Sequence, residues 1–208
     1  MARREAVIFD IGNVLIGWQP ERFFDREVGE ARRREMFAAV DLHGMNDRID
    51  AGEPFGQVVR ETAAATPGFE AEIALWHDRW IELTGPVIDG SVHLLQRLKA
   101  RGVPVFALTN FGRETYEVAR PVYPFLDAFD RAFVSGHIGT IKPDPAIYAH
   151  VEDESGVAPE ALLFTDDRAD NIAAAEARGW GVHHFNGAEG LAARLVAEGL
   201  LSEEDARW

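Results

Sequence analysis

Polar side chains directly follow several short apolar runs of this sequence. Asp10 follows residues 6–9, and the pair Asp166 and Asp167 follows residues 162–165. Short continuous apolar runs are typical of strands that are buried on both faces of a sheet. In open α/β sheets, ligands bind at the carboxyl ends of such strands. These carboxylates are therefore candidates for ligand binding.

Asp10 shows the pattern most clearly, because Gly12 and Asn13 behind it favour a turn. We expect its carboxylate at the carboxyl end of a buried parallel strand. The alternative is that the Asp10 carboxylate only caps the turn. Whether polar residues also follow the other strands helps to decide between a ligand-binding and a capping role.

A third strand end is polar, since Thr109 and Asn110 follow the apolar run 103–108. Strands that are separated by helices form right-handed crossovers and a parallel sheet, with all carboxyl ends at one edge. Asp10, Thr109 and the acidic pair are therefore predicted to converge at that edge.

The elements that must position these side chains alternate regularly from Gly85 onward. We predict helices over residues 91–100, near Glu114, and over 144–155, 169–178 and 191–198, with strands at 103–108, 131–134, 162–165 and 180–185. Together with the first strand, this pattern predicts an α/β fold with a Rossmann-like parallel sheet and helices on both faces.

Residues from about Pro20 to Leu83 have helical patterns only. A block without strands is a natural insertion into an alternating fold. We therefore expect a core domain formed by residues 1–17 and 85–208, and a small all-helical domain formed by residues 18–84, inserted after the first strand.

Composition limits the function. The chain has 208 residues and no cysteine, which excludes disulfides, thiolate catalysis and cysteine metal sites. The formal net charge of −14 argues against a nucleic-acid partner. A small anion needs only local positive charge, which a metal ion, one lysine or helix N-termini can provide.

Because the N-terminal residues lead straight into the first predicted strand, we expect no signal peptide. No apolar run approaches the roughly 18 residues that a membrane helix needs. We expect a cytoplasmic protein with no membrane partner. The sequence leaves a monomer and a homodimer open.

The polar strand ends resemble the motifs of the haloacid dehalogenase superfamily of hydrolases. Four motifs occur in the family's order across essentially the whole chain: Phe9-Asp10, Leu108-Thr109-Asn110, Lys142-Pro143-Asp144-Pro145, and Phe164-Thr165-Asp166-Asp167 with Asn171 four residues on. The resemblance implies a Mg²⁺-dependent phosphatase that acts on a small phosphorylated metabolite through an aspartyl-phosphate.

In that resemblance Asp10 is the nucleophile. Mg²⁺ would be bound by Asp10, the backbone carbonyl of Gly12 and Asp167, which supply the hard oxygen ligands that this ion prefers. Asp166 would orient the neighbouring lysine or a metal-bound water.

The same resemblance implies a phosphate-binding set. Thr109 and the backbone of Asn110 would donate hydrogen bonds to the phosphoryl oxygens, and Lys142 would pair with both Asp10 and the phosphoryl group. Thr109 and Lys142 therefore join Asp10 as predicted catalytic residues.

The helical block resembles the small cap domain of the family, which closes over the site and selects the substrate. Trp18, His43 and Asn46 are its candidate substrate contacts. Asp47 lies in the same polar segment.

Gly12 departs from the family pattern, because most of its phosphatases carry a second aspartate there as general acid and base. The pattern Asp-x-Gly-Asn-Val resembles a subgroup of α-D-glucose-1-phosphate phosphatases. We therefore expect a sugar phosphate as substrate, with 1-phosphates preferred over 6-phosphates because an anomeric hydroxyl is the better leaving group. His43 or Asp47 could instead supply the proton.

Two other functions stay open. A 2-haloacid dehalogenase attacks carbon without a metal and has no use for the acidic pair. A catalytically weak binding or regulatory protein would fit the missing carboxylate at Gly12, although the other motif residues are intact.

Overall fold

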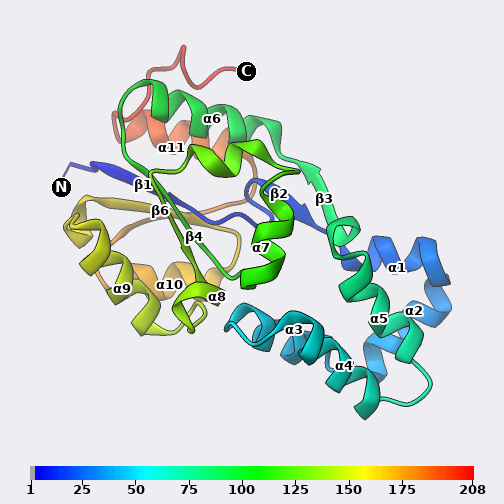
Figure 1. The fold of residues 1–208 in the computed structure, drawn as a ribbon. Helices are drawn as coiled ribbons and strands as arrows, with labels where there is room; N and C mark the ends of the chain where they lie inside the picture. The colour runs from blue at the N-terminus through cyan, green and yellow to red at the C-terminus, as the bar shows by residue number, and fades with distance from the viewer. Residues whose placement is uncertain (1–2) are drawn as a thin grey trace.

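The computed structural model describes residues 3–208, and its centre is a five-stranded parallel sheet (Figure 1). The spatial order of the strands is β5-β4-β1-β6-β7. Their bounds are Ala6–Phe9 for β1, Val105–Thr109 for β4, Arg131–Val134 for β5, Leu162–Asp166 for β6 and Gly181–His184 for β7. The predicted α/β fold with a parallel sheet is confirmed.

Helices cover both faces of the sheet, because the buried strands alternate their side chains between two apolar clusters. Val7 and Phe9 face the cluster under α6 (Asp89–Ala100) and α11 (Ala188–Ala197). Ala6 and Ile8 face the cluster under the helices of the opposite layer, α9 (Pro145–Ser155) and α10 (Ala169–Ala177). Figure 1 shows the two helical layers above and below the strands.

The order of the strands fixes where a ligand can bind. The chain passes from β1 to β4 on one side of the sheet and returns to β6 on the other, so β1 lies between them. A crevice opens outside the carboxyl ends at such a switch point. Asp10, Thr109 and Asp166 stand at these three adjacent ends.

A second, two-stranded sheet connects the parallel sheet to the helical block. β2 (Ile16–Trp18) pairs antiparallel with β3 (Thr84–Val87). Sequence patterns did not predict this ribbon, since both strands are short and contain glycine. The two glycines allow the strands to approach closely, because a Cβ on Gly17 would lie only 3.2 Å from the Cα of Gly85.

The helical block (residues 20–83) lies to one side of the sheet (Figure 1). Within the described residues it contains helices only, as its sequence pattern indicates: α1 Pro20–Val28, α2 Glu30–Ala39, α3 Leu42–Asp50, α4 Phe55–Ala65, α5 Glu70–Asp78 and a 3₁₀ turn at Trp80–Leu83. Across residues 3–208, none of the helices combines the length and hydropathy that crossing a bilayer requires.

The C-terminal end of α3 is docked onto the sheet domain near α7 (Arg113–Ala119) and α8 (Ser135–Ile138). The buried Ser135 hydroxyl donates a hydrogen bond of 2.6 Å to the backbone carbonyl of Asp50. Two residues on, Gly52 has a φ of +98°, and a Cβ there would lie 2.6 Å from the carbonyl oxygen of Gly136. This close backbone approach holds the end of α3 in place.

We expect Gly52→Ala to loosen this docking. A positive φ costs a non-glycine residue about 1–2 kcal/mol, and the added methyl group also collides with Gly136. Gly68→Ala is the matched control, because Gly68 has a φ of +94° with open space around its Cβ position. Hydrogen exchange should accelerate in α3 of the Gly52 variant alone. Equal protection of α3 in the two variants would contradict the docking.

Candidate active site

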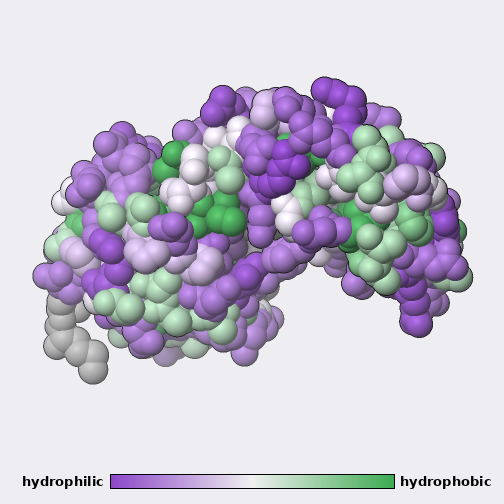
Figure 2. Space-filling view, turned by 90° about the horizontal axis from the view of Figure 1, so that it is seen from below, coloured by the Kyte–Doolittle hydropathy of each residue, from purple (hydrophilic) through white to green (hydrophobic). Residues whose placement is uncertain are grey.

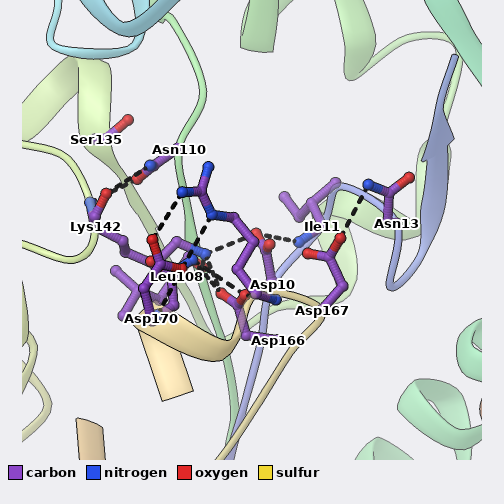
Figure 3. Close-up of polar contacts among 12 residues, drawn as sticks. Asp10, Ile11, Asn13, Leu108, Asn110, Ser135, Lys142, Asp166, Asp167 and Asp170 are labelled. Atoms are coloured by element: carbon purple, nitrogen blue, oxygen red, sulfur yellow. Dashed lines mark hydrogen bonds and ion pairs between the residues drawn. The ribbon is translucent and has the colours of Figure 1, made fainter. Parts of the chain in front are cut away.

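Lys142 lies at the centre of the polar cluster between the strand ends (Figure 3). Its ammonium group is 2.6 Å from Asp166 Oδ2 and 3.0 Å from Asp10 Oδ1, and it donates to the carbonyl of Leu108 at 2.9 Å. The lysine is 2% exposed. Burial alone would lower its pKa, but the two carboxylates outweigh burial and hold the pKa of Lys142 above its ordinary value.

Asn110 fixes the backbone that carries this lysine. Its side-chain amide donates to the carbonyl of Lys142 at 3.0 Å, and its Oδ1 accepts from the Lys142 amide at 2.7 Å. The sequence analysis predicted a role for the Asn110 backbone only. The side chain couples the end of β4 to the loop that precedes α9, and the role of the backbone stays a prediction.

Asp166 is fully engaged within the protein. It accepts hydrogen bonds from Lys142, from the side-chain amide of Asn171 at 3.0–3.1 Å, and from the backbone amide of Arg168 at 2.8 Å. Its side chain is completely buried. These contacts suit a residue that orients the lysine.

Asp167 has a different environment, although it is the next residue. It is partly exposed, and its Oδ2 accepts a hydrogen bond of 3.0 Å from the Asn13 side chain. Asn13 has a φ of +54° and also accepts from the backbone amide of Trp18 at 2.9 Å. The turn after β1 therefore places one carboxylate beside the entrance to the helical block.

Asp10 is 7% exposed, and only one of its carboxylate oxygens makes polar contacts within the described part of the chain. Oδ1 accepts from the Ile11 amide at 2.7 Å and pairs with Lys142. Among the described residues, Oδ2 accepts no hydrogen bond. Burial and the nearby Asp166 raise the pKa of Asp10, and Lys142 opposes that rise.

The three carboxylates fit a divalent cation. Oxygens of Asp10, Asp166 and Asp167 lie within 4.8 Å of one another. Three carboxylates against the Lys142 ammonium leave excess negative charge, and burial also raises the pKa of Asp167. A hard cation would offset this repulsion. Asp10, Gly12 and Asp167 line the same cavity. The two carboxylates and the backbone carbonyl of Gly12 could therefore bind Mg²⁺ together.

A cavity of about 260 Å³ lies above this cluster, between the strand ends and the helical block. In the space-filling view, the sheet domain and the helical block form a larger and a smaller lobe, with a narrower region between them (Figure 2). The polar end of the cavity contains Asp10, Gly12 and Lys142. The rest of the lining includes four aromatic residues, Trp18, Trp80, Phe111 and Tyr123, together with the polar residues of α3.

The structure brings most of the predicted site residues to this cavity. The lining includes the predicted substrate contacts Trp18, His43 and Asn46. The His43 side chain is 74% exposed. Thr109 and Asp166 are buried and do not belong to the described lining. Their predicted roles, like those of the other site residues, stay predictions.

Asp50 lines the cavity as well, and the sequence analysis missed it. It is the last residue of α3, is 8% exposed and accepts a hydrogen bond of 2.8 Å from Asn46. A signal was present, since α3 repeats polar residues at positions 43, 46, 47 and 50, which share one helix face. That face is directed toward the strand ends.

The chain belongs to the family of haloacid dehalogenase-like hydrolases, whose model matches residues 5–179. A relative is the sesquiterpene phosphatase astK of Aspergillus oryzae, which is 28% identical over 86% of this chain and 89% of its own length. The chloroplast flavin mononucleotide hydrolase 1 of Arabidopsis thaliana is 33% identical over 54% of this chain and 46% of its own length.

Solved structures share the fold. A haloacid dehalogenase family enzyme from Bacteroides thetaiotaomicron superposes with a TM-score of 0.72 at 22% identity, covering 89% of this chain and 95% of its own. That enzyme was also solved in complex with magnesium and inorganic phosphate. The L-2-haloacid dehalogenase from Xanthobacter autotrophicus superposes with a TM-score of 0.63 at 21% identity, covering 98% of this chain and 86% of its own.

The two adjacent aspartates should respond differently to substitution. Asp167→Asn should weaken Mg²⁺ binding at least tenfold in calorimetric titrations and change stability little. Asp166→Asn should lower the free energy of unfolding by about 3 kcal/mol, because it leaves a buried ammonium short of a charged partner. Urea denaturation measures the second effect. Similar losses of Mg²⁺ affinity and stability in both variants would contradict this division.

Proposed function

We propose that this hydrolase is a Mg²⁺-dependent phosphatase, and that Asp10 attacks the phosphorus of a small phosphate monoester. One observation carries the proposal. Asp10 lines the cavity and is anchored through Oδ1 by Lys142 and the Ile11 amide, while its Oδ2 accepts no hydrogen bond from residues 3–208. A carboxylate held in this way presents one oxygen as a nucleophile without reorientation.

In the proposed reaction, Asp10 Oδ2 forms a bond to phosphorus and the bond to the leaving oxygen breaks. Water then attacks phosphorus and releases phosphate, which regenerates the Asp10 carboxylate. Lys142 stays fixed beside Asp10 and offsets negative charge throughout. Thr109 and the Asn110 backbone are proposed donors to the phosphoryl oxygens.

Mg²⁺ would be held by Asp10, Asp167 and the Gly12 carbonyl, with Asp166 behind them. When bound, it supplies positive charge that neutralises the phosphoryl oxygens. The complex of the Bacteroides enzyme with magnesium and inorganic phosphate supports this choice of ion and of substrate group.

A phosphatase explains the site better than a 2-haloacid dehalogenase. Asp167 places a second carboxylate beside Asp10, and an anionic haloacid would meet that charge without a metal to offset it. The likeness to the Xanthobacter dehalogenase concerns the fold and does not decide the reaction. The intact cluster of Asp10, Lys142 and Asp166 also argues against a protein that only binds or regulates.

The walls of the cavity favour an apolar leaving group. Trp18, Trp80 and Phe111 offer aromatic faces. A neighbouring cavity of about 340 Å³ shares Trp18, His43 and Asn46 with the first and is otherwise lined by Asp41 and by four apolar residues, Phe37, Val40, Leu42 and Trp76. We propose an isoprenoid or aromatic phosphate in place of the glucose 1-phosphate that the subgroup resemblance suggests. The sesquiterpene phosphatase among the relatives supports this choice.

We also propose that residues 18–84 form a cap domain over a core of residues 1–17 and 85–208. The β2–β3 ribbon stands at both of these boundaries. This proposed cap would contribute Trp18, Trp80 and the polar face of α3 to the cavity, and so it would select the leaving group.

Asp10→Asn should abolish turnover of 4-nitrophenyl phosphate. The amide cannot form the covalent intermediate, and we expect a loss of at least about 10³-fold in a variant that is less stable but still folded at the assay temperature, since Asp166 still pairs with Lys142. Asp127→Asn is the control, because it removes an exposed carboxylate that pairs with Arg120 away from the cavity. Activity of the Asp10 variant near the wild-type rate would contradict the proposed nucleophile.

A matched substrate panel tests the leaving group. With Mg²⁺ present, we expect kcat/KM for an isoprenyl monophosphate to exceed that for glucose 1-phosphate and glucose 6-phosphate by at least about tenfold, from burial of apolar surface. Trp18→Ala should reduce the difference. A preference for either sugar phosphate would overturn the apolar assignment, and halide release from 2-chloropropionate would overturn the phosphatase.

A further inference from the structure

We propose that Asp50 transfers the proton in this reaction, as general acid toward the leaving oxygen and then as general base toward water. The inference rests on the proposed phosphatase function. It assigns to Asp50, at the C-terminal end of α3, the role of general acid and base that Gly12 cannot perform because it has no side chain.

Position 12 is open space in this structure. Gly12 carries no side chain, and a Cβ built there would meet no atom within 4 Å. Gly12 is also absent from the residues with positive φ, so its backbone does not demand glycine. The site has room for a carboxylate at this position but lacks one, and the proton must come from elsewhere.

Asp50 lies on the side of the cavity where the leaving group would be. In-line displacement places the leaving oxygen opposite the attacking oxygen. Asp10 attacks from the carboxyl end of β1, and so the leaving oxygen points toward α3. Both Asp10 and Asp50 line the same cavity.

Asp50 is held rigidly, as a catalytic acid must be. Asn46, one turn earlier in α3, donates to Asp50 Oδ2 at 2.8 Å. The Ser135 hydroxyl donates to its backbone carbonyl at 2.6 Å, and the same hydroxyl accepts from the Phe111 amide at 2.9 Å. The carboxyl is therefore held by its own helix, and the backbone that carries it is fixed to the residues that follow β4 and β5.

The surroundings of Asp50 favour the protonated form. Burial, followed by the nearby Asp47 carboxylate, raises the pKa of Asp50 to about 8. Asp10 contributes to the rise, whereas the Gly112 amide and Lys142 oppose it. A carboxyl that is largely protonated at neutral pH can donate a proton.

The two proposed steps balance. As the bond from phosphorus to the leaving oxygen breaks, that oxygen takes the proton of the Asp50 carboxyl and departs as an alcohol. Asp50 is left as a carboxylate. It then accepts a proton from the water that attacks phosphorus, which releases phosphate and restores both aspartates. Because Asp50 would protonate the leaving oxygen, phosphate esters of ordinary alcohols should react as well. The absence of a carboxylate at Gly12 is then no longer a reason to expect a preference for anomeric phosphates.

The test compares Asp50→Asn with wild type on two substrates. For 4-nitrophenyl phosphate, whose leaving group needs no proton, kcat/KM should stay within about threefold. For phenethyl phosphate, an alkyl ester with an aromatic group, kcat/KM should fall at least about 10²-fold. The variant should also show a burst of nitrophenol, followed by slower turnover, because water activation is impaired.

The double variant Gly12→Asp/Asp50→Asn adds a rescue. The new carboxylate enters the open space beside Asp10, and at least tenfold of the lost kcat/KM for the alkyl ester should return. Asp50→Ser provides the same comparison if the amide variant does not fold. Equal losses on both substrates, or no loss on the alkyl ester, would overturn the role of Asp50. Failure of wild type to hydrolyse either ester would overturn the proposed function instead.

Discussion

A buried ammonium group shared by two carboxylates is the interaction on which this site depends. Lys142 is nearly inaccessible to solvent and contacts Asp10 and Asp166 at 3.0 and 2.6 Å. Removing either partner from such a pair leaves an uncompensated buried charge, which typically costs about 3–5 kcal/mol. The strand ends, the Asn110 amide and the Asn171 amide all serve to hold this group in place.

The two domains that we propose make different contributions to the site. The sheet edge supplies fixed charge around Asp10, and charge that is already oriented costs no reorganisation during a reaction. The helical block supplies aromatic walls and the polar face of α3, which ends at Asp50. Gly52 lets the backbone behind Asp50 approach the carbonyl of Gly136 closely. Precise docking of one helix end thus completes the cavity.

Sequence patterns predict the parallel sheet because buried strands have short apolar runs, and they indicate Asp10 and Asp166 because each follows such a run. They miss the β2–β3 ribbon, where Gly17 and Gly85 pack closely against each other, because glycines otherwise indicate loops. They also miss Asp50. The periodicity of α3 indicates the polar face to which Asp50 belongs, but it contains no information on where that face docks, which involves contacts such as the hydrogen bond from Ser135, 85 positions away, to the Asp50 carbonyl.

The central claim is that Asp10 carries the phosphoryl group, and chemical trapping tests it most directly. Wild-type protein is mixed with Mg²⁺ and an aryl phosphate that is radiolabelled in its phosphate group, quenched in acid within milliseconds, digested and mapped by mass spectrometry. We predict a hydroxylamine-labile phosphoryl group on Asp10 that disappears on longer incubation. Label on another residue, or turnover that never labels the protein, would contradict the account.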